Sequence, residues 1–262
     1  MRLKRPALLL LATFLISIPA AAQPQGDPQA FALLQRAYAA LSGGQAISDV
    51  TLTGTARRVA GSDDETGTAT LKALATGAGR LDHTFPSGQR GEVRNTSANP
   101  PSGSWSGPDR ISHPIPYHNL ITDPTWFFPV FLIGRVLSTS NYVEAYVGRE
   151  TRDSVAVDHV TLSQKFATSS QAGALLQHLS QIEIYLASGT SLPVALTFNV
   201  HPDNDAGLDI PIEIRFSDYH TVGGAQVPFR VQKFLNNGLV LNLQFQTVAL
   251  NTGLTASAFS TQ

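Results

Sequence analysis

Hydrophobic and polar residues alternate with a period of two in one segment after another from residue 50 to residue 246. In the first segment, for example, Val50 and Leu52 alternate with Thr51 and Thr53. Such alternation places hydrophobic side chains on one face of a β-strand and polar side chains on the other. The segments that show it are 50–56, 66–73, 81–85, 89–95, 142–152, 155–166, 182–186, 194–200, 210–217, 227–231 and 239–246.

Strands with one hydrophobic and one polar face are typical of an antiparallel meander, in which one face of the sheet is in contact with solvent. The hydrophobic face must be covered by another layer. Only the curvature of the sheet and a few helices are available for this. We therefore predict a mainly β (α+β) fold, in which a strongly curved antiparallel sheet forms an open half-barrel. An N-terminal helix and a helical lid are expected on its concave face.

The N-terminal helix is predicted to follow Asp27-Pro28, a capping residue and a proline at the first helical position. It is expected to end at 42–44, where the sequence reads Ser-Gly-Gly. Its apolar stripe, at spacings of three and four, is formed by Phe31, Leu34, Tyr38 and Leu41.

The lid is predicted from the most hydrophobic segment of the chain after its N-terminal leader, Trp126 to Ile133. Asp123-Pro124 is a cap and first-turn signal, so one or two short helices are expected from there to about Leu137. Pro129 is expected to start a second helix or to kink the first. Segment 95–116 is rich in Ser, Gly, Asn and Pro, which predicts a loop around one short strand near Trp105. Residues 169–179 are expected to form a short helix or a long loop.

The N-terminus is typical of a cleavable secretory signal peptide. Arg2, Lys4 and Arg5 precede the uncharged apolar stretch 6–18, and Ala20 to Ala22 provide a signal-peptidase site. We expect residues 1–22 to be removed and 23–262 to form a single exported domain in the periplasm or outside the cell. Because the chain contains no Cys, a lipidated N-terminus is not expected.

The charge balance argues against nucleic acid as a partner. Three of the 18 Lys and Arg residues lie in the signal peptide, which leaves 15 against 19 Asp and Glu. No basic cluster is present that would neutralise phosphates. Charged residues make up only 14% of the chain, below the usual quarter, and uncharged polar residues take their place.

The order of the predicted elements, namely a helix, several meandering strands, a lid insertion and more strands, resembles the LolA-like fold of periplasmic lipoprotein carriers and their relatives. Residues 50–94 look like the first half of their sheet. The local likeness is greatest near the C-terminus, at Asp218-Tyr219, Gly223-Gly224, Val227-Pro228, Asn237-Gly238 and the segment from Leu250-Asn251 to Phe259.

The resemblance implies an open barrel with a hydrophobic cavity under a lid of helices. Relatives carry lipoproteins, bind lipids or glycolipids, sense mislocalised lipoproteins or, in a few cases, catalyse reactions. The carriers latch the lid with a basic residue followed by Pro near the end of the second or third strand. In this chain that stretch reads Leu74-Ala75-Thr76-Gly77, which argues against a dedicated lipoprotein carrier.

The resulting hypothesis is a non-enzymatic binding or carrier protein of the bacterial envelope for a lipid, an acyl chain or a lipidated protein, with transient contact at a membrane surface. An alternative is a protein-interaction or sensor module on the same scaffold, which uses a sheet edge or the 95–116 loop. The expected ligand-binding residues are Trp126, Phe128, Phe131, Leu132, Ile133, Leu71, Phe85, Ile184, Leu196, Phe198, Ile214 and Phe229.

Candidate catalytic or metal-binding groups are few. His113 and His118 flank Tyr117, but prolines prevent a helix between the two histidines and no carboxylate lies beside them in sequence. Asp203, Asp205 and Asp209 offer an oxygen cluster that could bind calcium weakly, but their spacing does not fit an EF-hand loop and turns commonly use such residues. No nucleophile elbow, phosphate-binding loop or zinc-protease motif is present. We therefore expect no catalytic residue, metal or cofactor, and an enzyme is the least favoured alternative. It would be supported if His113 or His118 faced the cavity near a carboxylate.

Overall fold

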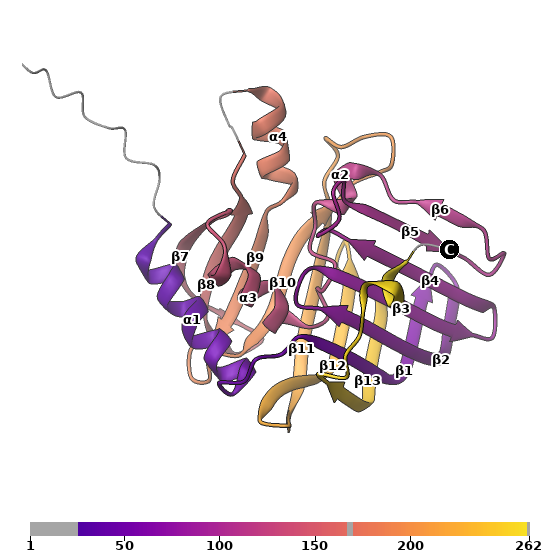
Figure 1. Cartoon of the computed structure of the whole chain (residues 1–262), viewed down its shortest axis with the longest axis horizontal. Helices are drawn as coiled ribbons and strands as arrows, with labels where there is room; N and C mark the ends of the chain where they lie inside the picture. The colour runs from indigo at the N-terminus through magenta and orange to yellow at the C-terminus, as the bar shows by residue number, and fades with distance from the viewer. Residues whose placement is uncertain (1–25, 167–169, 261–262) are drawn as a thin grey trace, which may run out of the picture.

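The computed structural model describes residues 26–166 and 170–260. The predicted signal peptide lies outside the described residues. Thirteen strands form one antiparallel sheet in the order β6-β5-β4-β3-β2-β1-β13-β12-β11-β10-β9-β8-β7 (Figure 1). The strands are β1 (Asp49–Ala60), β2 (Asp63–Leu74), β3 (Ala78–Phe85), β4 (Gly88–Asn95), β5 (Ser102–Ser106), β6 (Ser112–Pro114), β7 (Tyr142–Arg152), β8 (Val155–Gln164), β9 (Ile182–Ala187), β10 (Pro193–Val200), β11 (Ile210–Val222), β12 (Ala225–Leu235) and β13 (Gly238–Leu250).

The sheet is not closed into a barrel, as predicted. Neighbouring strands are also consecutive in sequence, except where β1 pairs with β13. This pairing joins the first strand to the last and divides the sheet into two arms. The outermost strands of the arms, β6 and β7, are consecutive in sequence but lie at opposite edges. The segment between them must therefore cross from one edge of the half-barrel to the other.

That crossing segment is the lid, which we define as residues 117–138. It contains α2 (Tyr117–Leu120) and α3 (Pro129–Ser138). The sequence suggested that a helix begins directly after Asp123-Pro124, but no helix begins there. Instead, Asp123 Oδ1 accepts a 2.7 Å hydrogen bond from the backbone N–H of Thr125 and stabilises a turn. Pro129 starts α3, which is one of the two predicted alternatives, and its missing N–H costs nothing in the first turn of a helix.

The N-terminal helix α1 (Pro28–Ser42) begins and ends as predicted. Asp27 Oδ1 accepts a 2.8 Å hydrogen bond from the N–H of Gln29, and Gly43 ends the helix at a φ of 59°. The predicted stripe is wrong at Phe31, which is 36% exposed. The buried face is rotated slightly and consists of Ala30, Leu33, Leu34, Ala37 and Leu41. This face packs against α3, β7 and β12.

Three further elements complete the fold. Helix α4 (Gln171–Leu179) follows β8, and a short 3-10 turn, η1 (Ala256–Phe259), follows β13. The region around Trp105 contains two strands rather than the one predicted. The second, β6, is three residues long and ends in Pro114. Proline is tolerated there because β6 is an edge strand.

The β1–β13 seam explains the Leu250-Asn251 pattern. Asn251 has a φ of 55°, a conformation that Asn adopts more readily than most residues. Its Oδ1 accepts a 2.8 Å bond from the N–H of Ser48, and its Nδ2 donates to the carbonyl of Ala46 at 3.0 Å. Phe259 then packs against Ala78 and Val93. The C-terminal segment is thereby fixed to the first arm of the sheet.

Asp49 stabilises the same seam from inside. Its carboxylate, 1% exposed, accepts hydrogen bonds from Thr252 N and Oγ1 at 2.8 Å, Ser48 Oγ at 2.9 Å and Gly253 N at 3.1 Å. Burial alone would raise the pKa of Asp49, but the hydrogen bonds from Thr252, Ser48 and Gly253 outweigh it and lower the pKa. The ionised carboxylate is therefore favoured in the folded state.

Asp49→Ala is expected to lower the free energy of unfolding by about 3 kcal/mol at neutral pH, because it removes the buried charged acceptor of the hydrogen bonds from Ser48, Thr252 and Gly253. Because the folded pKa is depressed, this contribution is present above about pH 4 and is lost as the pH falls through the folded value. Urea unfolding at pH 7 and at pH 3 should show the difference from wild type shrinking in acid. Asp82→Ala, in the more exposed Arg80 pair, is the control and should cost under about 1 kcal/mol. Equal losses for the two variants would contradict the role of Asp49.

Candidate ligand-binding site

The residues predicted to bind the ligand come together in one apolar cluster between the sheet and the lid. Phe198 and Phe229 are partly buried and pack against this cluster. The other ten are buried within it, at 5% exposure or less: Leu71, Phe85, Trp126, Phe128, Phe131, Leu132, Ile133, Ile184, Leu196 and Ile214. The cluster thus unites both arms of the sheet with α1 and the lid. Its role in ligand binding stays a prediction.

The lid fills much of the space beneath it with its own side chains. Phe127 and Phe128 are almost fully buried, and the ring of Phe128 meets that of Phe131 edge-on at 4.8 Å. A cleft of about 210 Å³ remains between α1, α3 and the end of β2. It is lined mainly by apolar residues, namely Tyr38, Ile47, Ala75, Val130, Phe131 and Gly134, together with Arg135 and Ser138.

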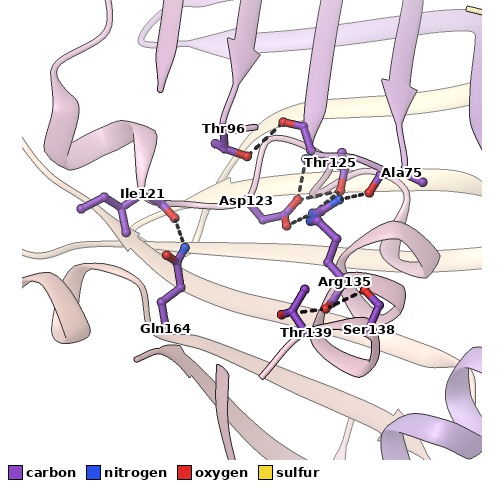
Figure 2. Close-up of polar contacts among 10 residues, drawn as sticks. Ala75, Thr96, Ile121, Asp123, Thr125, Arg135, Ser138, Thr139 and Gln164 are labelled. Atoms are coloured by element: carbon purple, nitrogen blue, oxygen red, sulfur yellow. Dashed lines mark hydrogen bonds and ion pairs between the residues drawn. The ribbon is translucent and has the colours of Figure 1, made fainter. Parts of the chain in front are cut away.

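At this cleft a polar latch joins the start of the lid to α3 and, through one hydrogen bond to Ala75, to the sheet side, as Figure 2 shows. We define the latch as Arg135, Asp123, Thr125 and Ala75. The guanidinium of Arg135 forms an ion pair with Asp123, donates to Thr125 Oγ1 at 3.1 Å and donates to the Ala75 carbonyl at 3.2 Å. The side chains of Arg135 and Asp123 are only 15% and 7% exposed, so solvent screens their attraction weakly.

The latch reverses the arrangement that the resemblance implied. There the sheet supplies the basic residue, whereas here α3 supplies Arg135 and the sheet side supplies only the carbonyl of Ala75, directly after β2. The sequence pattern did not indicate this role, because Arg135 stands alone in a hydrophobic segment. A single positive charge within an otherwise buried helix was the available signal.

A second tie joins the lid to the other arm of the sheet. The Nε2 of Gln164, at the end of β8, donates to the Ile121 carbonyl at 3.3 Å (Figure 2). A polar cavity of about 200 Å³ lies here, and Arg135 lines both this cavity and the apolar cleft.

Charged residues, including Lys233, Glu92 and Arg94, lie on the concave face next to Trp126. Lys233 Nζ lies 5.1 Å from the centre of the Trp126 ring. Burial lowers the pKa of Lys233, and the nearby Glu92 opposes this effect. Burial would raise the pKa of Glu92, but Arg94 and Lys233 lower it below its usual value. Both pKa directions therefore reflect a partly buried cluster of opposite charges.

Histidine and arginine residues extend this charged region. Burial lowers the pKa of His83 to about 4, so its ring is neutral at neutral pH. Arg94 donates to Glu92 Oε1 at 2.7 Å and reaches the lid through the Asn119 carbonyl at 2.8 Å. The strand pattern contained a signal for this region. Glu92 lies opposite the buried Leu81, and Lys233 lies opposite the buried Ile214. Both residues therefore occupy inward-facing positions of their strands, although they are charged.

The predicted histidine pair is not brought together as a site. His113 stacks on Trp105, with ring centres 4.4 Å apart, at the β5–β6 edge. His118, on α2, lies instead beside His201, with ring centres 6.2 Å apart. Within the described ranges, no helix is both long enough and apolar enough to span a membrane.

Known structures share this architecture. A domain from Vibrio parahaemolyticus named for outer membrane lipoprotein sorting superposes with a TM-score of 0.56 at 11% identity, over 88% of this chain and 96% of that one. A LolA superfamily protein from Nitrosomonas europaea gives 0.55 at 13% identity, over 88% and 97%. The chain has a LolA-like fold. A DUF1329 family protein from Desulfovibrio piger is equally similar, with a TM-score of 0.55 at 10% identity, over 88% and 96%.

These similarities establish the LolA-like fold and no more, because the sequence identities are low. Neither a family model nor a curated protein matches the sequence. The lid and latch are thus the features of this LolA-like chain from which its function must be argued.

Arg135→Met is expected to lower the free energy of unfolding by about 2–4 kcal/mol, because it leaves Asp123 buried without its cation. Hydrogen exchange of the α3 amides should accelerate more than that of β11 amides, since the lid alone is released. Arg57→Met is a matched control, because its ion pair with Asp64 is about half exposed, and it should cost under about 1 kcal/mol. Unchanged exchange in α3 would show that the latch does not hold the lid.

Proposed function

We propose that this chain is an exported binding or carrier protein for an apolar ligand, such as a lipid, an acyl chain or a lipidated protein, in the bacterial envelope. One observation carries the proposal: the short lid segment, rather than a second sheet, covers the apolar concave face of an open half-barrel. The lid is held by polar contacts at Arg135, at Gln164 and around Asn119. An apolar chain that entered between lid and sheet would bury the same surfaces.

The energetics favour long apolar chains. Burial of about ten methylenes gains roughly 8 kcal/mol, but the ligand must first displace lid contacts and break the latch. A short chain would not offset these costs. The charged region around Lys233, Glu92 and Arg94 lies next to Trp126, so a ligand with a polar head and an apolar tail would match the two halves of the concave face.

The names of the structural neighbours agree with this proposal, since one of them refers to outer membrane lipoprotein sorting. The predicted signal peptide would place the chain in the periplasm. The ligand residues proposed from the sequence, above all Trp126, Phe128 and Phe131, would contact the apolar chain.

A protein-interaction or sensor role is the second candidate, and one observation favours it. Three large hydrophobic side chains are exposed close together in sequence around β6: Trp105 at 44%, Ile111 at 56% and Tyr117 at 53%. Exposed aromatic residues are common in protein interfaces. On this reading the 95–117 region would contact a protein partner, and the lid would stay closed.

Ligand uptake distinguishes the two candidates. Wild-type protein exported by its host should show co-purified lipid in native mass spectrometry, and delipidated protein should bind a fluorescent long-chain fatty acid. Arg135→Met removes the latch, so its apparent Kd should fall by roughly tenfold as the open state becomes more populated. Asp123→Asn should act in the same direction with less change in side-chain volume.

Arg57→Met is the control and should bind as wild type does. An apo mass, together with no fatty-acid uptake by wild type or by Arg135→Met, would contradict the carrier proposal. A stoichiometric protein partner captured from envelope extract without lipid would then favour the interaction module.

A further inference from the structure

Two histidines and a carboxylate from separate parts of the chain converge beside α2. His178 lies on α4, and His201 and Asp209 lie in the connection between β10 and β11. Asp209 Oδ1 is 3.0 Å from His178 Nε2 and 2.9 Å from His201 Nε2. One donor atom from each residue can be chosen so that all three lie within 4.8 Å of one another.

This convergence differs from the other histidine–carboxylate contacts in the part of the chain that the structure describes. His159 pairs with Glu183, and His220 pairs with Asp218, each as an isolated pair. Only the His178 group combines three potential metal ligands within the described ranges. The two imidazole rings lie 6.4 Å apart at an angle of 67°, so their nitrogen atoms approach the shared carboxylate from different directions.

The donor set matches the chemistry of a transition-metal ion. Imidazole nitrogen binds Zn²⁺ at about 2.0–2.1 Å and carboxylate oxygen at about 2.0–2.2 Å. Tetrahedral ligands at these distances are separated by about 3.3 Å, which is close to the two observed separations between a histidine nitrogen and Asp209 Oδ1, 3.0 and 2.9 Å. Three protein ligands would leave a fourth position for water, and His178 and Asp209 are 46% and 40% exposed, so an ion can reach the site.

The surrounding structure holds one of the ligands rigidly. The side chain of His201 is only 1% exposed. Its backbone is fixed by the Asn119 side chain, which donates to the His201 carbonyl at 2.8 Å and accepts from the His201 N–H at 3.0 Å. Such pre-organisation by the end of α2 lowers the entropic cost of binding.

We propose that His178, His201 and Asp209 form a binding site for a divalent transition-metal ion, with Zn²⁺ as the ion that suits the donor set. Bound metal would join α4 to the β10–β11 connection and to α2, at one end of the lid. The site is separate from the apolar cluster and does not depend on ligand binding there. His118 is not a ligand, because its Nε2 lies 3.0 Å from the Pro202 carbonyl.

The affinity should be moderate. His201 Nδ1 is buried without a hydrogen-bond partner among the described residues, whereas metal-bound imidazoles usually donate their second N–H to an acceptor. Loss of such an outer partner typically weakens metal binding by about 10–100-fold. We therefore expect binding that is readily reversed by a chelator.

Calorimetric titration of Zn²⁺ into metal-free protein, purified without a histidine tag, tests the site. Wild type should bind one Zn²⁺ per chain. His178→Ala and Asp209→Asn should weaken binding at least about tenfold, and both residues are exposed enough for the variants to fold. The matched control, His220→Ala, removes a histidine from an isolated and similarly exposed pair with Asp218 and should leave Zn²⁺ binding unchanged.

Co²⁺ supplies a second measurement. A tetrahedral site gives intense visible absorption, which should appear with wild type and with His220→Ala but not with His178→Ala. Zn²⁺ binding that is unaffected by His178→Ala and Asp209→Asn, or no binding by folded wild type, would overturn the proposal. Circular dichroism of each variant would confirm that loss of metal does not reflect loss of fold.

Discussion

The structure depends on one topological constraint: the two edges of an open sheet are joined by a single segment of the chain. Because β6 and β7 are consecutive in sequence but lie at opposite edges, the intervening lid has to cross the open side of the half-barrel. The concave face is apolar, so the crossing segment must be apolar as well. This explains why the most hydrophobic stretch of the folded chain lies between two polar loops rather than in a strand.

The same constraint explains where the polar contacts of the lid are placed. A lid that contacted the sheet only through apolar side chains would have no fixed register. The Arg135 latch fixes one end against β2, and Arg94 and Gln164 bond to backbone carbonyls of the lid at Asn119 and Ile121. These contacts are few compared with the apolar area that they hold in place. Under the proposed carrier function, such a balance would let the lid open without unfolding the sheet.

Much of the fold could be predicted from the sequence because alternation and capping are local signals. The antiparallel half-barrel, the start and end of α1 and the lid segment all follow from them. Phe31 was placed on the buried stripe because spacing alone cannot give the rotation of a helix relative to its neighbours. Asp123 was interpreted as a helix cap, but its carboxylate instead accepts the N–H of Thr125 in a turn and forms an ion pair with Arg135.

The candidate sites were less predictable, because they depend on contacts between distant segments. Seven of the twelve apolar residues could be chosen from strand phase and five from the hydrophobic lid segment, and the fold places them in one cluster. The charged region could have been noticed at Lys233, which continues the inward phase of Val231. His178, His201 and Asp209 could not be connected, since 23 and 8 positions separate them in the numbering and no local motif relates them.

The central claim, that an apolar chain enters between the lid and the sheet, can be tested through the two tryptophans of the chain. Trp126 is 4% exposed within the cluster, whereas Trp105 is 44% exposed at the sheet edge. In Trp105→Phe protein, a brominated long-chain fatty acid should quench the remaining Trp126 fluorescence saturably, because bromine must approach the ring closely. The Trp126→Phe protein, which reports on Trp105, should be quenched little. Saturable quenching of Trp105 with none of Trp126 would contradict the account.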